Sequence, residues 1–387
     1  MLKVFFKKVV KHLRWFADSY RDYFRFKKIY NDSFYVFISH NGDSAGGAPV
    51  VMFELMRSLK DGKNMVLLCE KPGEIIESAR ESGIYAYSMY LNRKKYLKLV
   101  KNKGARIVVV NTVVAYNSLK LLNGNINCPI FWWLHEENKL LDRYSDLIPE
   151  SLSPNVKILC VSERVRDGII NIMPEFKNIT EIFYYGCKDL YDEEEDKKPN
   201  NVFTISVIGR ICERKNQLQV IDAYNLLPQE IRENTVIQFV ASSSEDSYLN
   251  KLKDRVDNNR NIHFTGAVQR EKMPKVYKNS SLIICSSIDD PLPVVITEAM
   301  MYKRAFITSS STGQYSLIQN NVNGFVYDIN STEQLSEQII NVYKSDNLEQ
   351  IEDNARKTYL EYFTYEKVKI NFEKLLSESV KENSDEK

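Results

Sequence analysis

Short and almost continuously apolar runs alternate with helical patterns along most of this 387-residue chain. Runs such as Arg106–Asn111 and Leu282–Cys285 lack the polar alternation of a strand with one wet face. A strand that is apolar on both sides has to be covered on both sides, as in a parallel sheet between two layers of helices. The pattern therefore predicts an α/β fold with doubly wound parallel sheets.

The alternation occurs in two series, and the charged stretch Tyr191–Asn200 separates them. A chain of this length has too many residues for one ordinary core, so each series is expected to form its own domain. The sequence predicts a basic amphipathic helix at 1–30, a first Rossmann-like domain at 31–191, a linker at 192–200 and a second Rossmann-like domain at 201–364. Helices are expected at Lys215–Leu227, at Gln314–Gln319, and in one long pattern from Glu349 to about Val380.

Two carboxylates, Asp290 and Glu298, stand eight residues apart after the strand-like run Leu282–Cys285. A helix expected from Val294 begins between them, and a helix N-terminus offers free N–H groups and partial positive charge. That end of a helix suits a phosphate, whereas carboxylates accept hydrogen bonds from sugar hydroxyls. The segment therefore predicts a site for a nucleotide sugar.

A second segment, Gly209–Lys215, joins a strand to a helix in the same half of the chain. Gly209 permits a tight turn without a side chain in the way. Arg210 and Lys215 flank the helix start and combine a guanidinium fork with an ammonium charge, which suits a diphosphate. An ordinary solvated basic turn has the same spacing, so the prediction depends on the acidic segment further along the same domain.

Together the two segments resemble the Gly-x-Arg…Lys and acidic-x7-Glu elements of retaining GT-B glycosyltransferases, especially the large family 4 type. The resemblance implies two Rossmann-like doubly wound domains that face a central cleft, and a hexosyltransferase that works without a metal ion. It implies a UDP- or GDP-linked sugar as donor substrate and no other cofactor. It also implies that the final helix, at 365–387, packs back on the first, acceptor-binding domain.

The same resemblance assigns roles within the second domain. Arg210 and Lys215 are expected to bind the donor diphosphate and to neutralise charge on the departing nucleotide. Asp290 is expected to hold hydroxyls of the transferred sugar, and Glu298 those of the ribose.

Two positions depart from the commoner family pattern. Asp290 stands where Glu is usual, and Pro293 stands where Gly is frequent. The N–H groups of Val294 and Val295, directly after this proline, are expected to meet the sugar or a phosphate. The departures leave the identity of the sugar open.

In the first domain a glycine-rich turn, Asn41–Val50, follows the first expected strand. It lacks the G-x-G-x-x-G spacing of dinucleotide-binding proteins, and an ordinary tight turn is the alternative interpretation. The turn resembles the Gly-Gly/Thr-Gly-Ala-Pro loop of the family. The resemblance implies that Gly46 and Gly47 approach donor and acceptor.

The expected strand Ile130–Leu134 ends in His135 and Glu136. A single histidine is often structural, and that interpretation stays open here. The resemblance implies that His135 contacts the transferred sugar or its acceptor. A zinc-protease interpretation fails, because the chain has no His-Glu-x-x-His sequence.

The first 28 residues hold nine lysines and arginines against Asp18 and Asp22, interleaved with apolar and aromatic residues. Such a helix either lies on an anionic membrane surface or packs on the first domain as an extra helix. Its apolar stretches are too often interrupted by charge to span a membrane. No small-residue cleavage site follows them, so a signal peptide is not expected.

Charge and cysteine content argue against two classes of function, nucleic-acid binding and zinc binding. A net charge of +2 gives no case for nucleic acid, and the six cysteines include no C-x-x-C pair, so reduced buried thiols are expected rather than zinc ligands. We expect a cytoplasmic protein, peripheral at the inner face of the membrane, that glycosylates a saccharide or lipid-linked acceptor in bacterial cell-surface polysaccharide synthesis. The alternatives are a GT-B nucleotide-sugar epimerase or phosphorylase, and a catalytically silent subunit that binds sugar nucleotide or scaffolds an assembly.

Overall fold

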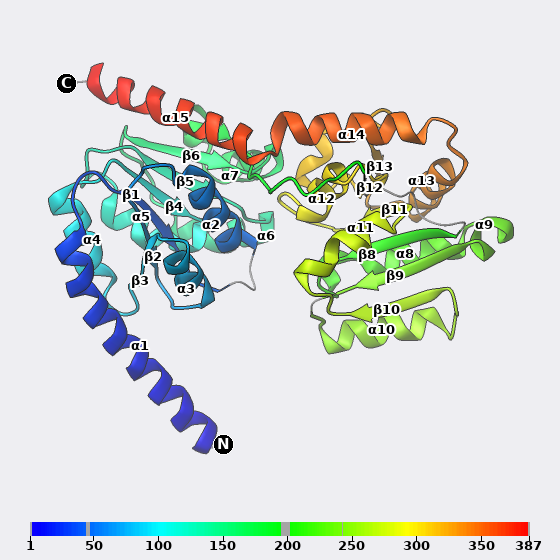
Figure 1. The fold of residues 1–387 in the computed structure, drawn as a ribbon, viewed down its shortest axis with the longest axis horizontal. Coiled ribbons are helices and arrows are strands. Elements are labelled where there is room, and N and C mark those ends of the chain that lie inside the picture. Colours follow the sequence, from blue (N-terminus) through cyan, green and yellow to red (C-terminus); the bar gives the residue numbers. More distant parts are fainter. Residues whose placement is uncertain (1, 44–46, 195–201, 242, 386–387) are drawn as a thin grey trace. The chain divides into compact units, whose positions relative to one another are not determined.

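The computed structural model describes residues 2–43, 47–194, 202–241 and 243–385, and within these ranges the side chains from residue 9 to residue 381. The chain divides into two compact units, Met1–Gly186 with Tyr365–Lys387, and Cys187–Thr364 (Figure 1). The first unit ends at Gly186 and not at Tyr191, because the backbone of Cys187 already pairs with Phe363 and Thr364 of the second unit. Residues 195–200 of the expected linker lie outside the described residues.

The first unit is built on one seven-stranded parallel sheet. Its strands are β1 Tyr35–Ser39, β2 Met65–Cys69, β3 Tyr85–Ser88, β4 Ile107–Asn111, β5 Ile130–Leu134, β6 Val156–Cys160 and β7 Thr180–Ile182. They pair in the order β3-β2-β1-β4-β5-β6-β7. Strands β1, β2, β4 and β5 are buried along their whole length, which is why their sequences show no polar alternation.

The helices of the first unit include the last helix of the chain. They are α1 Leu2–Ile29, α2 Gly47–Leu59, α3 Glu74–Glu81, α4 Arg93–Lys103, α5 Tyr116–Leu122, α6 Asn138–Tyr144, α7 Glu163–Ile172 and α15 Tyr365–Asp385, with 3-10 turns η1 Val113–Ala115, η2 Ser145–Leu147 and η3 Pro174–Ile179. Helix α15 packs against α2, where Lys369 Nζ lies 2.5 Å from the Asp61 carboxylate. The ring of Phe372 meets that of Phe131 in β5 at 5.8 Å. The end of the chain thus contributes to the core around the first sheet.

The second unit has a six-stranded parallel sheet. Its strands are β8 Phe203–Ile208, β9 Thr235–Val240, β10 Ile262–Gly266, β11 Leu282–Cys285, β12 Phe306–Ser309 and β13 Phe325–Tyr327. Their order, β10-β9-β8-β11-β12-β13, is that of a Rossmann sheet. The order reverses between β8 and β11, and in such sheets ligands bind outside the carboxyl ends of the strands at that reversal.

The helices of the second unit correct three expectations. They are α8 Gln217–Asn225, α9 Gln229–Glu233, α10 Asp246–Val256, α11 Met273–Lys278, α12 Val294–Met301, α13 Thr332–Lys344 and α14 Leu348–Tyr362, with 3-10 turns η4 Glu213–Lys215, η5 Arg270–Lys272 and η6 Gly313–Leu317. Lys215 lies in η4 because Asn216 takes a left-handed conformation and delays α8. The helix expected at Gln314–Gln319 is the 3-10 turn η6. The long pattern after Glu349 breaks into α14 and α15, since the carbonyl of Phe363 accepts a hydrogen bond from Cys187 instead.

The second half of α1 packs on the first unit, against β3 and α4. Phe26 is fully buried and stacks on Tyr96 with ring centroids 5.4 Å apart. Asp22 is also buried and pairs with Arg80 at 2.9 Å. Of the two interpretations of this helix, packing on the domain therefore holds for one face, while other side chains such as Tyr20 and Phe24 stay exposed.

None of the helices in the described part of the chain is long and apolar enough to cross a bilayer. All six cysteines are free, and Cys69, Cys160 and Cys285 are buried at the ends of β2, β6 and β11.

Gly73→Ala is expected to destabilise the first unit by roughly 1–3 kcal/mol. The backbones of Gly42 and Gly73 touch, and a Cβ at Gly73 would lie 2.2 Å from the carbonyl carbon of Gly42. Urea unfolding measures the loss. Gly47→Ala is the matched control, because a Cβ there meets nothing within 4 Å. Equal stability of the two variants would contradict this tight packing.

Candidate functional site

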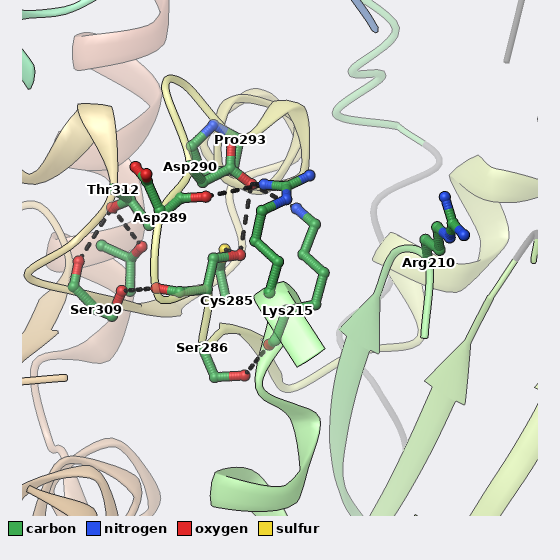
Figure 2. Close-up of polar contacts among 12 residues, drawn as sticks. Arg210, Lys215, Cys285, Ser286, Asp289, Asp290, Pro293, Ser309 and Thr312 are labelled. Atoms are coloured by element: carbon green, nitrogen blue, oxygen red, sulfur yellow. Dashed lines mark hydrogen bonds and ion pairs between the residues drawn. The ribbon is translucent and has the colours of Figure 1, made fainter. Parts of the chain in front are cut away.

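Two cations converge on one buried carboxylate at the reversal of the second sheet. Lys215 Nζ lies 2.5 Å from Asp290 Oδ2 (Figure 2). Arg214 Nη1 donates to the carbonyl of Asp289 at 2.9 Å and lies 3.4 Å from the same Asp290 oxygen. The side chains of Asp290 and Lys215 are only 9% and 18% exposed. The structure therefore brings Lys215 of the basic segment and Asp290 of the acidic segment together.

Serine side chains hold together the loops that carry this cluster, as Figure 2 shows. Ser286 Oγ, after β11, donates to the carbonyl of Lys215 at 2.8 Å. Ser309 Oγ, at the end of β12, donates to the carbonyl of Ser287 at 2.5 Å. The loops after β8, β11 and β12 are thus joined by short polar contacts, which hold the charged groups in place.

Charge attraction outweighs burial in this cluster. Burial alone would raise the pKa of the Asp290 carboxyl, but the charges of Lys215 and Arg214 hold that pKa below its usual range. Burial would likewise lower the pKa of Lys215, but the negative charge of Asp290 raises it above the ordinary value. Both groups are therefore charged at neutral pH.

Arg210, expected beside Lys215, lies elsewhere. Figure 2 shows it apart from the cluster, and its guanidinium is 3.3 Å from Glu245, with the side chain 56% exposed. The turn before it has the expected geometry, because Gly209 has a φ of +142°, which an L residue adopts only with strain. In this cluster sequence reasoning missed Arg214. Only the 3-10 turn η4 directs its guanidinium to Asp290, so its position next to Lys215 was the only signal.

The second carboxylate of the acidic segment is held by a tyrosine. Tyr277 Oη donates to Glu298 Oε2 at 2.5 Å. Tyr277 is 1% exposed and its ring stacks on that of Tyr302 at 5.1 Å. Burial raises the pKa of Glu298, although the hydrogen bond from Tyr277 opposes the rise. No sequence signal pointed to Tyr277.

The start of α12 leaves donors available beside Asp290. Pro293 is the N-cap, and its carbonyl accepts from Gln314 Nε2 at 2.9 Å. Val294 and Val295 form the first turn, and neither N–H donates to any residue that the structure describes. Two backbone donors and the positive end of a helix therefore lie on the same loop as the ion pair.

In the first unit a buried glutamate follows β5. Glu136 is 4% exposed and accepts hydrogen bonds from the N–H of His135 at 2.8 Å and from that of Val113 at 2.9 Å. Burial raises the pKa of Glu136 to about 7, since it outweighs these hydrogen bonds. Sequence reasoning weighed His135 and overlooked the burial of the residue after it.

His135 itself is neutral. Burial, with the nearby charge of His40, lowers its pKa to about 3. Its ring packs on Trp133 at 4.3 Å, and its buried Nε2 has no hydrogen-bond partner among the described residues. The histidine therefore keeps one unused polar atom, which suits contact with a ligand hydroxyl.

Two further residues of this cluster were not predicted. Thr112 Oγ1 and His40 Nδ1 lie 3.2 Å apart after β4 and β1, the strands at which the first sheet reverses. Thr112 has a φ of +77°, which is strained for a β-branched residue and is often seen at functional sites. The position of His40 directly after the first strand was the available signal.

The glycine turn is only partly described. Gly46 lies outside the described residues, and Gly47 is the first residue of α2. Because a Cβ at Gly47 would meet nothing within 4 Å, packing within the chain does not require glycine there. Among the described residues no group of three or more His, Cys, Asp or Glu is placed to hold a metal ion.

Lys215→Met is expected to lower the stability of the second unit by about 3 kcal/mol, because it leaves the buried Asp290 without its closest counter-ion. The double variant Lys215→Met with Asp290→Asn should lose much less stability than the two single variants lose in sum. Urea unfolding of the four proteins in this cycle measures the coupling. The more exposed pair Lys303–Asp353, also 2.5 Å apart, is the control and should couple by less than about 1 kcal/mol. Equal coupling in the two pairs would contradict the role of burial.

Glu136→Gln is expected to change how stability depends on pH. The folded pKa of Glu136 lies above its ordinary value of 4.5, so the folded state binds more protons than the unfolded state between pH 4.5 and about 7. Wild-type stability should therefore fall across this window relative to the variant, in unfolding experiments at a series of pH values. Glu150→Gln, at an exposed carboxylate of the same unit, should keep the wild-type profile. Parallel curves for wild type and Glu136→Gln would refute the raised pKa.

Comparisons with known proteins agree with this architecture. Residues 191–358 match the sequence profile of the family described as glycosyl transferases group 1. An uncharacterized glycosyltransferase of Methanocaldococcus jannaschii is 28% identical over 231 residues, which span 58% of this chain and only 58% of that protein.

Solved structures match over nearly their whole length. Anabaena HepE in complex with UDP and glucose aligns with a TM-score of 0.73 at 16% identity, covering 88% of this chain and 99% of that one. The lipopolysaccharide outer core galactosyltransferase WaaB aligns with a TM-score of 0.69 at 15% identity, covering 88% and 98%. This chain therefore has the GT-B fold, and within its second unit residues 191–358 match the glycosyl transferases group 1 family.

Proposed function

We propose that this protein is a retaining glycosyltransferase that moves a hexose from a nucleotide sugar to a hydroxyl of a saccharide or lipid-linked acceptor. The observation that carries the proposal is the Lys215–Asp290–Arg214 cluster. It lies where the second sheet reverses, in the segment that matches the glycosyltransferase family. The Anabaena relative, solved with UDP and glucose, supports a UDP-linked donor.

The cluster supplies the charge that the reaction needs. The bond between the sugar carbon and the diphosphate oxygen breaks, and the acceptor oxygen forms its bond on the same face of the sugar. The acceptor proton passes to the departing phosphate. Lys215, Arg214 and the N–H groups at the start of α12 neutralise that phosphate, so these groups of the chain and not a metal ion stabilise the leaving group. Arg210 joins them if it leaves Glu245 when the donor binds.

Each carboxylate of the acidic segment then has one oxygen engaged. Lys215, Arg214 and Ser287 all reach Oδ2 of Asp290, which leaves Oδ1 to accept a hydroxyl of the transferred sugar. Tyr277 engages Oε2 of Glu298, which leaves Oε1 for the ribose hydroxyls. Asp290 thus positions the diphosphate-binding lysine and contacts the sugar at once.

In the first unit we propose that His135 forms a hydrogen bond with a hydroxyl of the transferred sugar or of the acceptor. Its unpartnered Nε2 and its lowered pKa make it a neutral ligand and not a general acid. The likeness to the lipopolysaccharide galactosyltransferase WaaB supports an acceptor in bacterial cell-surface polysaccharide synthesis at the cytoplasmic face of the membrane.

Thermal unfolding against UDP-, GDP-, ADP- and TDP-linked sugars tests the donor site. A UDP-sugar at ~100 times its Kd is expected to stabilise the protein by about 2.7 kcal/mol. Lys215→Ala should abolish the shift, because the diphosphate loses its closest cation. Arg260→Ala, at an exposed arginine of the same unit, is the matched control and should keep it.

Activity is measured as nucleotide released from the donor in the presence of acceptor. Tyr277→Phe is expected to raise the KM for the donor several-fold with little change in kcat, since it frees Glu298 without touching the reacting atoms. Donor binding without any turnover would favour a silent sugar-nucleotide-binding subunit. Turnover unchanged in Lys215→Ala would refute the site.

A further inference from the structure

Helix α1 carries an apolar stripe that stays exposed. Val9, Leu13, Phe16, Tyr20 and Phe24 recur every three or four residues, so they lie along one face of the helix. They are between 39% and 63% exposed. Aromatic and aliphatic side chains gathered along one exposed face point to a binding surface and not to a solvated one.

A different face of α1 fixes the helix on the first unit. Tyr96 Oη donates to the carbonyl of the buried Ser19 at 2.8 Å, and Arg80 pairs with Asp22 at 2.9 Å. Phe26 is buried further along the same face. The N-terminal end of the helix projects beyond the rest of this unit (Figure 1). The apolar stripe is therefore presented on a firmly held support.

Cations line another exposed face of α1. Lys11, Arg14, Arg21 and Arg25 are exposed and again recur at helical spacing. Asp18 lies among them and pairs with Arg21 at 2.7 Å and with Arg14 at 3.9 Å. Arg25 pairs in turn with the buried Asp22 at 3.3 Å, so two acidic groups stand against these four basic ones and the net charge stays positive.

The neighbouring helix α4 extends the positive charge. Lys94, Lys95 and Lys98 are exposed on α4. Lys95 Nζ lies 4.3 Å from the ring centroid of Tyr20, which belongs to the apolar stripe of α1. Cations therefore lie on another face of α1 and, from α4, directly beside the stripe.

We infer that this surface of α1 and α4 docks on a lipid bilayer that carries anionic headgroups. A helix in the plane of a membrane interface buries an apolar stripe among the acyl chains and places its cations at the headgroups. Aliphatic residues such as Val9 and Leu13 offer nothing to a nucleic acid. A second copy of the chain in a two-fold dimer would bring the same cations face to face, which costs energy.

This inference does not depend on the proposed transferase activity. Vesicle binding needs neither donor nor acceptor, so its failure leaves the donor site untouched. Loss of the donor site in turn leaves the membrane surface in place.

Cosedimentation of the full chain with vesicles tests the inference. We expect binding to vesicles of phosphatidylglycerol and phosphatidylcholine in equal parts, weak binding to phosphatidylcholine alone, and weakening as salt rises. Leu13→Glu with Phe16→Glu should lower the affinity at least about tenfold, because it puts charge into the apolar stripe. Arg14→Gln with Arg25→Gln should lower it about fivefold per charge removed.

The control is Leu360→Glu with Ile370→Glu, at side chains that are 46% and 53% exposed on other helices. It should bind vesicles as wild type does, and thermal unfolding checks that every variant is folded. Equal binding to both vesicle types, or wild-type binding by Leu13→Glu with Phe16→Glu, would overturn the inference. A dimer that this stripe variant abolishes, with no vesicle binding, would show a protein interface instead.

Discussion

The reversal of strand order in each sheet is the constraint on which both candidate sites depend. In a parallel sheet the connections on either side of the reversal run to opposite faces, and the loops after the two central strands separate. In the second unit those loops follow β8 and β11 and carry Lys215 and Asp290. In the first unit they follow β1 and β4 and carry His40 and Thr112. The same topology thus gathers polar residues twice in one chain.

The buried ion pair is better explained by binding than by stability. Removing a lysine and an aspartate from water costs several kcal/mol per ion, and the attraction between them repays that only with good geometry. Here Asp290 Oδ2 accepts hydrogen bonds from Lys215, Arg214 and Ser287. These donors together offset the desolvation of the carboxylate. A lysine held in this way is already in place for a second anion. Preorganised charge of this kind is what stabilises a phosphate leaving group.

In the first unit, burial raises the pKa of a carboxylate instead of being outweighed by nearby charges. Glu136 has neutral hydrogen-bond donors beside its carboxylate, namely backbone N–H groups and the Thr112 side chain, and burial raises its pKa to about 7. Asp290 and Glu136 therefore differ because Asp290 has cations beside it, whereas no described cation is among the groups that shift the pKa of Glu136. The neutral His135 lies next to this glutamate with an unused nitrogen. The strain at Thr112 lies in the same cluster, which is consistent with a site and not with simple core packing.

Much of this fold follows from the sequence, because a strand buried on both faces needs an unbroken apolar run. The runs Ile130–Leu134 and Leu282–Cys285 are strands with the predicted bounds. Lys215 and Asp290 were predicted as site residues from the chemistry of their side chains and from the family resemblance. The charges of α1 excluded a membrane span, but the sequence left open whether the helix packs on the domain or lies on a membrane.

What the sequence could not determine depends on where the backbone turns. Arg210 and Arg214 have the same side chain and lie in the same segment. Only the 3-10 turn before Asn216 brings Arg214 to Asp290. Tyr277 reaches Glu298 from another helix, a contact that no local pattern encodes. By itself the sequence determined the parallel sheets, the two units and the types of side chain at the candidate sites, since burial and residue type are local properties. The tertiary structure alone decided which charges meet, because hydrogen bonds and ion pairs depend on distances between residues far apart in the chain.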